Sequence, residues 1–239
     1  MQYAVSDIHG NYEAYKSLLR VINLKESDIL YIVGDVVDYG DGSIKILKDM
    51  MMHGNIIPLL GEHEYMAYKV LRLMRKSPEK CMSNPKTKKM AEIWIKRGGE
   101  KTLADFMKLD DFDKDDILDF FEEFSAYEEV KADGKSFVLV HGGFKEFDPQ
   151  KPMHEYKISE LLTGSIDPDR EYFKNKYVVS GHISTELMSG DYRGQVVVKG
   201  KNIFLDCGCT GKENIGCFRL EDGKIFYSDL PEEKHDDLD

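Results

Sequence analysis

The chain has 239 residues, of which 41% are hydrophobic, so it can bury one sizeable core and falls within the size range of a single domain. Its 33 lysine and arginine residues face 44 aspartate and glutamate residues, and the net charge of −11 disfavours general binding to nucleic acid. No apolar run approaches the roughly 20 residues that span a bilayer, and the N-terminus lacks the pattern of a signal peptide. We therefore expect a cytoplasmic protein with no membrane partner.

The first third of the chain alternates short β-rich runs with helical periodicity. The pattern predicts a strand just before Asp7, a helix over 12–22, a strand over 29–33, a helix over 44–51 and a strand over 55–60. This order is typical of an α/β protein.

Residues 77–135 interrupt the alternation with a lysine-rich run and an apolar stripe at Ile117, Phe120, Phe121 and Phe124. We expect a helical insertion there, within a single domain of residues 1–239. Strands resume over 137–140 and 177–180, and residues 186–229 are expected to form antiparallel strands with a hairpin turn at 221–224. The acidic residues 231–239 are expected to be a disordered tail. The predicted architecture is two sheets packed face to face with helices outside.

The four cysteines do not indicate a disulfide framework. Cys207 and Cys209 would lie on one face of a strand, where disulfide geometry is poor, and Cys81 and Cys217 are isolated. A Cys-x-Cys zinc pair is an alternative, but no second pair has structural-zinc spacing. Buried, reduced thiols are the favoured interpretation.

Five of the predicted strands end in a motif that contains aspartate, glutamate or histidine next to glycine. Loops at strand ends converge on one rim of a sheet, so we expect these side chains to meet. Carboxylate and imidazole donors together suit manganese, iron or zinc rather than calcium. The candidate metal ligands are Asp7, His9, Asp35, Glu62, His141 and His182.

These motifs carry a family resemblance that extends over nearly the whole chain. They read Asp7-Ile8-His9-Gly10, then Gly34-Asp35-Val36-Val37-Asp38-Tyr39-Gly40, then Gly61-Glu62-His63-Glu64, then Val138 to Gly143, then Gly181-His182. In this order they resemble the bacterial phosphoprotein-phosphatase branch of the calcineurin-like metallophosphoesterases. The resemblance implies a four-layer sandwich of two mixed β-sheets with helices outside.

The resemblance also implies a site with two divalent metal ions and a metal-bridging hydroxide as the nucleophile. Manganese is the first expectation for the metal, with iron or zinc as alternatives. In the implied ligand set Asp7, His9 and Asp35 hold one ion, and Asp35 bridges to a second ion held by Glu62, His141 and His182. His63 would then be the general acid that protonates the leaving group, oriented by Asp38. A plain metal ligand is the alternative role for His63.

Two positions depart from the family pattern. Position 62 is glutamate in place of asparagine, and position 39 is tyrosine in place of a phosphate-binding arginine. A second such arginine is not evident near residues 161–164. Arg97, Arg170 and Arg193 are the candidate substitutes for substrate binding.

Three functions remain open from the sequence. A metal-dependent protein serine/threonine phosphatase is the first expectation. The alternative is a diadenosine tetraphosphatase or another nucleotide phosphodiesterase, which the missing arginines favour. A catalytically weakened metal-binding interaction protein is the third, although retention of His63 and Asp38 argues against it. The expected partner is therefore a phosphoprotein, or a phosphorylated small molecule or nucleotide.

Overall fold

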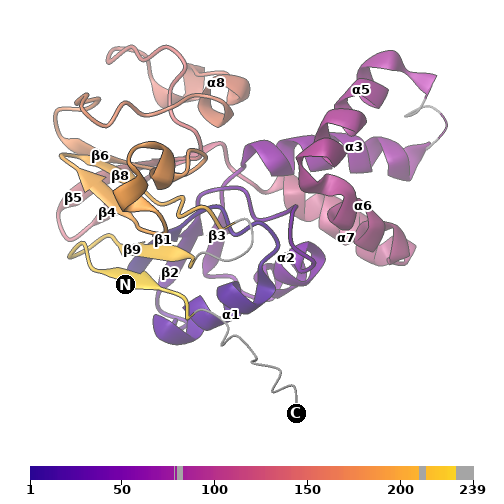
Figure 1. The fold of residues 1–239 in the computed structure, drawn as a ribbon, viewed down its shortest axis with the longest axis horizontal. Helices are drawn as coiled ribbons and strands as arrows, with labels where there is room; N and C mark the ends of the chain where they lie inside the picture. The colour runs from indigo at the N-terminus through magenta and orange to yellow at the C-terminus, as the bar shows by residue number, and fades with distance from the viewer. Residues whose placement is uncertain (78, 80–82, 210–213, 230–239) are drawn as a thin grey trace.

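The computed structural model describes residues 1–77, 79, 83–209 and 214–229, and Figure 1 shows how its elements are arranged. The strands are β1 (Gln2–Val5), β2 (Ile29–Ile32), β3 (Ile56–Pro58), β4 (Tyr127–Ala132), β5 (Lys135–Val140), β6 (Lys176–Ser180), β7 (Val197–Lys199), β8 (Asn202–Phe204), β9 (Gly216–Arg219) and β10 (Ile225–Tyr227). The helices are α1 (Tyr12–Val21), α2 (Ser43–Met51), α3 (Glu62–Lys76), α5 (Pro85–Trp94), α6 (Glu100–Lys108), α7 (Asp111–Glu122) and α8 (Ile158–Leu162), with a π-helical turn η1 (Ile95–Gly99) between α5 and α6. Three short 3-10 helices follow, η2 (Met153–Glu155), η3 (Thr185–Leu187) and η4 (Gly190–Tyr192).

The strands form two mixed sheets of five strands each. The first sheet has the order β10-β9-β1-β2-β3, with β1, β2 and β3 parallel and β9 antiparallel to β1. The second has the order β4-β5-β6-β8-β7, with β5, β6 and β8 parallel. Each sheet therefore contains three adjacent parallel strands, and the carboxyl ends of these three strands lie at the same edge of the sheet.

Side chains alternate between the two faces of the strands and thereby create separate apolar layers. In β1, Tyr3 and Val5 face the helices, whereas Ala4 faces the second sheet. In β5, Leu139 faces the first sheet, whereas Val138 faces the outer layer that contains α8. The two sheets thus pack face to face with helices outside, which confirms the predicted fold class.

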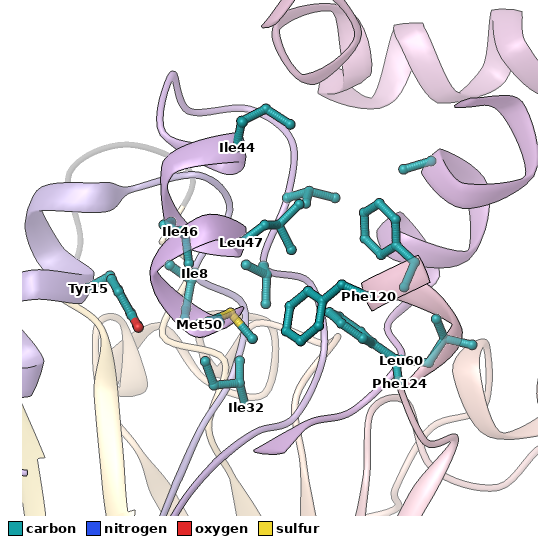
Figure 2. Packing of buried hydrophobic residues seen from close by; sticks show 14 of the residues in the cluster. Ile8, Tyr15, Ile32, Ile44, Ile46, Leu47, Met50, Leu60, Phe120 and Phe124 are labelled. Atoms are coloured by element: carbon teal, nitrogen blue, oxygen red, sulfur yellow. The ribbon is translucent and has the colours of Figure 1, made fainter. Parts of the chain in front are cut away.

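Helices α1, α2, α3 and α7 cover the outer face of the first sheet. Figure 2 shows Leu47 of α2 and the rings of Phe120 and Phe124 from the segment around α7 directed into one apolar space. Both phenylalanine side chains are buried, so the predicted aromatic stripe belongs to the core. Local capping supports this layer, because the Asp110 side chain accepts a hydrogen bond from the amide of Asp113 at the start of α7.

The helical part of the predicted insertion is shorter than residues 77–135. Residues 127–132 are not helical but form β4, which pairs antiparallel with β5 along its whole length. Only Val130 and Ala132 are aliphatic in this edge strand, so its alternation is too weak to be recognised before its partner is known.

The predicted C-terminal strands are largely confirmed, with one correction. The turn at 221–224 joins the antiparallel pair β9 and β10, and β7 pairs antiparallel with β8. However, β8 is also parallel to β6, a crossover that an antiparallel arrangement of residues 186–229 does not include.

Cys207, Cys209 and Cys217 are buried and form no disulfide, as expected. Cys81 and the acidic tail at 231–239 lie outside the described residues. Among the described residues, no helix is both long enough and apolar enough to cross a bilayer.

Candidate metal centre

The carboxyl ends of the parallel strands bring the predicted ligands to one edge of the two sheets. Asp7 follows β1, Asp35 follows β2 and Glu62 follows β3, while His141 and His182 follow β5 and β6. A cleft of about 500 Å³ opens at this edge. Its lining includes eight of the predicted site residues, namely Asp7, His9, Asp35, Glu62, His63, His182, Arg97 and Arg193.

The backbone at this edge is locally strained. Of the eight non-glycine residues with positive φ in the described part of the chain, six belong to these loops: Asp7, His9, Asp35, Asp38, Tyr39 and His182. Such conformations cost on the order of 1–3 kcal/mol each and persist only where the surrounding structure enforces them. Their concentration at one edge makes this edge the candidate functional site.

Two glycines permit the close approach of these loops. A Cβ atom at Gly61 would lie 2.2 Å from Oδ1 of Asp35. Gly34 has a φ of +82°, and a Cβ atom there would lie 2.6 Å from Nδ1 of His141. The glycines of these motifs therefore allow the carboxylate and imidazole groups to meet.

Asp35 lies at the centre of the cluster. Its carboxylate belongs to two groups of potential metal ligands, one with His9 and His63 and the other with His141 and His182. Within each group the ligand atoms lie within 4.8 Å of one another. A carboxylate shared by two such groups is the arrangement expected of a bridging ligand between two ions.

Hydrogen bonds fix the orientation of two imidazole rings. Nδ1 of His9 lies 3.1 Å from the carbonyl oxygen of Val37, and Nδ1 of His141 lies 2.9 Å from that of Val33. With Nδ1–H donated to a carbonyl oxygen, Nε2 of each ring keeps its lone pair for a metal ion. Burial also lowers the pKa of His9, which favours the neutral, metal-binding form.

His141 presents a buried nitrogen that suits a metal ion. Its buried Nε2 has no assigned hydrogen-bond partner and lies 3.2 Å from Oδ2 of Asp35. Burial alone would lower the pKa of His141, but the adjacent Asp35 carboxylate raises it to about 10. The unsatisfied nitrogen beside a carboxylate fits a metal ligand.

The carboxylates of Asp7 and Asp206 repel each other. Burial and the charge of Asp206 raise the pKa of Asp7, and burial raises the pKa of Asp206 to about 6. Asp7 is held in place by its neighbours, since its carboxylate accepts hydrogen bonds from the amide of His182 at 3.0 Å and from the hydroxyl of Ser6. Divalent cations would relieve this repulsion, so the donor set fits two metal ions.

Asp206 was not among the predicted ligands, although it lines the cleft and is 7% exposed. It follows β8 as Asp7 follows β1, so its position at a strand end was the available signal. Its Oδ1 accepts a hydrogen bond of 2.8 Å from the amide of Gly208, which leaves Oδ2 without a described side-chain partner.

His63 and Asp38 form the predicted pair. Nδ1 of His63 lies 2.6 Å from Oδ2 of Asp38, and the indole N–H of Trp94 donates to the same oxygen at 2.7 Å. Burial alone would lower the pKa of His63, but the hydrogen bond to Asp38 raises it above its usual value. Asp38 thus holds the ring with Nε2 directed away from it, as either a proton donor or a metal ligand requires.

Glu64 anchors the loops although the sequence analysis gave it no role. Its fully buried carboxylate accepts hydrogen bonds from four backbone amides, those of Asp35, Val36, Val37 and Gly61, at 2.7–3.0 Å. It therefore ties the motif after β2 to the start of α3 and fixes the position of Asp35.

Glu62 contacts an arginine instead of the ligand groups. Nη1 of Arg97 lies 2.6 Å from Oε1 of Glu62, and Glu62 belongs to neither of the two ligand groups. Arg97 reaches the cleft from the π-helical turn η1, where Gly98 has a φ of +92° and accepts a hydrogen bond from the amide of Tyr39. The role of Glu62 as a ligand of the second ion therefore stays a prediction.

The three candidate arginines do not share one location. Arg97 and Arg193 line the cleft, and Nη1 of Arg193 lies 3.8 Å from Oε1 of Glu186. Arg170 does not line the cleft; its guanidinium packs over the rings of Phe147 and Tyr172. The prediction that Arg170 replaces a substrate-binding arginine is therefore not supported by its position.

Residues 3–202 match the model of the calcineurin-like phosphoesterase family. Because this match covers most of the chain, the protein belongs to that family.

Several curated relatives carry the same functional name. The symmetrical bis(5'-nucleosyl)-tetraphosphatase of Wigglesworthia glossinidia brevipalpis is 41% identical over 64 residues, which cover 26% of this chain and 24% of that protein. The protein of the same name from Delftia acidovorans is 29% identical over 144 residues, which cover 59% of this chain and 43% of that protein. The chain thus spans less than half the length of these two relatives.

Solved structures share the fold. A protein classed provisionally as a diadenosine tetraphosphatase has a TM-score of 0.62 at 20% identity, with 95% of this chain and 91% of that chain covered. A protein serine/threonine phosphatase from Saccharomyces cerevisiae has a TM-score of 0.56 at 16% identity, with 98% and 81% covered. At these identities the likeness concerns the fold alone, and it does not confirm the serine/threonine phosphatase branch.

Proposed function

We propose that this protein hydrolyses dinucleoside polyphosphates of the diadenosine tetraphosphate class in a metal-dependent reaction. The observation that carries the proposal is the composition of the cleft, which combines the ligand groups around Asp35 with the guanidinium groups of Arg97 and Arg193. Several cations along one cleft suit a chain of phosphates. The names of the curated relatives support the same substrate class.

We therefore favour a nucleotide substrate over a phosphoprotein substrate, although protein serine/threonine phosphatase was the first expectation from the sequence. Tyr39 occupies the position of a phosphate-binding arginine, and its ring lies 4.9 Å from that of His9 and 5.4 Å from that of His63. An aromatic ring of which 38% is exposed offers a contact surface to a nucleotide but no charge to a phosphoserine dianion.

The residues of the cleft divide the work of phosphoryl transfer. Two divalent ions, when bound, supply an acidified water molecule and neutralise charge on the phosphoryl group. Arg97 and Arg193 bind phosphate oxygens beyond the reacting phosphorus. Nε2 of His63 donates a proton to the departing oxygen, and Asp38 keeps the ring in the orientation that this transfer needs.

A weakened, non-catalytic scaffold is not favoured. Asp38 is fully buried and holds both His63 and Trp94. Without the Asp38 carboxylate, the N–H groups of His63 and Trp94 would be buried without an acceptor. Burying this carboxylate itself costs free energy, because it loses its hydration. A protein that only bound a metal would not need this arrangement.

A direct substrate comparison tests the proposal. We expect kcat/KM for diadenosine tetraphosphate to exceed that for a phosphoserine peptide when manganese is in excess, with nucleotide products separated by anion-exchange chromatography. Asp35→Asn, which removes the shared carboxylate, is the control for contaminating activity and should show neither reaction. A preference for the phosphopeptide would overturn the proposal and restore the serine/threonine phosphatase reading.

A further inference from the structure

A second cavity, open to solvent, is lined by residues on or next to helices α3, α5 and α8, which are labelled in Figure 1. Its volume is about 350 Å³. Met66 from α3, Met90 and Ile93 from α5 and Leu162 from α8 provide its apolar lining. The ring of Tyr65 adds an aromatic surface.

This cavity adjoins the catalytic cleft at one residue. Glu62, at the first position of α3, lines both. A ligand whose phosphate lies at the Asp35 cluster would pass Glu62 and enter the cavity with the group attached to that phosphate. The cavity is therefore placed to receive a part of the substrate that does not react.

Two lysines line the cavity on a protein of strongly negative net charge, and the carboxylate of Glu62, which also lines it, is paired with Arg97. Lys86 and Lys89, both exposed and on α5, line it, and neither takes part in an ion pair with another described residue. The whole chain has a net charge of −11. Two ammonium groups beside an apolar pocket therefore indicate a ligand that combines a flat apolar group with negative charge.

We propose that this cavity binds one nucleoside of the dinucleotide, with its base between Tyr65 and the aliphatic side chains and its phosphates near Lys86 and Lys89. The inference rests on the proposed function and names the subsite of that substrate. A pocket of this size is in the range of small-ligand sites, and bases stack on tyrosine rings regardless of sequence.

The other cavity next to the cleft is less suited to this ligand. It measures about 310 Å³ and is lined by residues at the starts of α1 and α2, among them Lys45. Its single lysine stands against the carboxylates of Glu13 and Asp41, and of these only that of Asp41 is paired with a described residue, Lys101, so that of Glu13 repels a polyphosphate. Charge complementarity therefore favours the cavity at α5.

A charge reversal at the rim tests the subsite. Lys89→Glu should raise KM for diadenosine tetraphosphate by about tenfold with little change in kcat. Lys88→Glu makes the same charge change one residue away on the same exposed helix but does not line the cavity, so its KM should stay close to that of the wild type. With bis-p-nitrophenyl phosphate, which has no nucleoside, the two variants should behave alike.

A substitution in the apolar lining of the cavity provides a second, independent test of the subsite. Ile93 is 42% exposed, so Ile93→Asp should fold, and it should weaken binding of adenosine monophosphate to the manganese-loaded protein in calorimetry. Met107→Asp is the matched control, because Met107 is 48% exposed on α6 and does not line the cavity. Thermal unfolding of each variant checks that the fold is retained.

The outcomes separate the two proposals. If the wild type hydrolyses diadenosine tetraphosphate but Lys89→Glu matches Lys88→Glu and Ile93→Asp matches Met107→Asp, the subsite is wrong and the proposed function stands. If the wild type hydrolyses bis-p-nitrophenyl phosphate but neither hydrolyses the dinucleotide nor binds adenosine monophosphate, both proposals fail. If Lys89→Glu lowers kcat/KM for both substrates equally, Lys89 acts on the reaction and the nucleoside subsite is overturned.

Discussion

Arg97 and Glu62 form an ion pair of 2.6 Å at the mouth of the cleft, although they come from separate elements, the π-helical turn η1 and the first turn of α3. The pair joins the helical segment to the metal centre. It also places a guanidinium group in the cleft that Tyr39 lines.

Replacing Arg97 should weaken substrate binding in the transition state. Because a hydrogen bond to a charged group contributes about 1.5–3 kcal/mol, Arg97→Met should lower kcat/KM for diadenosine tetraphosphate by roughly 10–100-fold. Arg170→Met removes a guanidinium that packs over Phe147 and Tyr172 outside the cleft, and it should leave kcat/KM unchanged. Equal losses in the two variants would contradict a specific role for Arg97.

Substitution of Glu62 tests whether its carboxylate is a ligand of the second metal ion. If its carboxylate turns from Arg97 to an ion, Glu62→Asn removes one negative charge from the ligand set, and the protein should retain less manganese after dialysis. The smaller ligand charge should also raise turnover of a phosphate monoester at saturating manganese. Elemental analysis and kcat provide the two measurements. Unchanged metal content together with unchanged kcat would show that Glu62 only pairs with Arg97.

His63 should matter most for leaving groups that need a proton. General acid catalysis contributes about 10²–10⁴-fold, so His63→Asn should slow phenyl phosphate hydrolysis far more than p-nitrophenyl phosphate hydrolysis. Metal content should remain at the wild-type value. Since His63 also belongs to a potential ligand group with His9 and Asp35, a loss of metal in this variant would instead assign it as a ligand.

Glu64 should be important for stability, because four backbone amides depend on its carboxylate. Glu64→Gln turns one acceptor into a donor that faces other donors, and leaving buried groups unsatisfied costs about 1–3 kcal/mol. Urea denaturation of the metal-free protein should show a loss of that size. Glu92→Gln, on an exposed part of α5, should lose almost nothing. Similar stability of the two variants would contradict an anchoring role.

The sequence predicted the parts of the fold and site that depend on local pattern. Strand-end motifs located Asp7, Asp35 and His141, because parallel strands must end at a common edge. Features that depend on contacts between distant segments were missed. β4 becomes a strand only by pairing with β5, and Asp206 enters the cleft only because β8 lies beside β6.

Side-chain contacts made by α5 and η1 were also not predictable from the sequence. Trp94 contacts Asp38 from the last turn of α5, and Arg97 contacts Glu62 from a kink in the backbone at Arg97 and Gly98. No periodicity in the sequence indicates such a kink. Arg170 was an equally good candidate by residue type, and only its position over two aromatic rings separates it from Arg97.

The most direct test of the metal centre is a titration of chelator-treated, metal-free protein with manganese, with hydrolysis of bis-p-nitrophenyl phosphate as the readout. Two ligand groups that share Asp35 predict that activity is absent without metal, rises with added manganese and levels off near two equivalents per chain. Full activity from protein that elemental analysis shows to be metal-free would contradict the account.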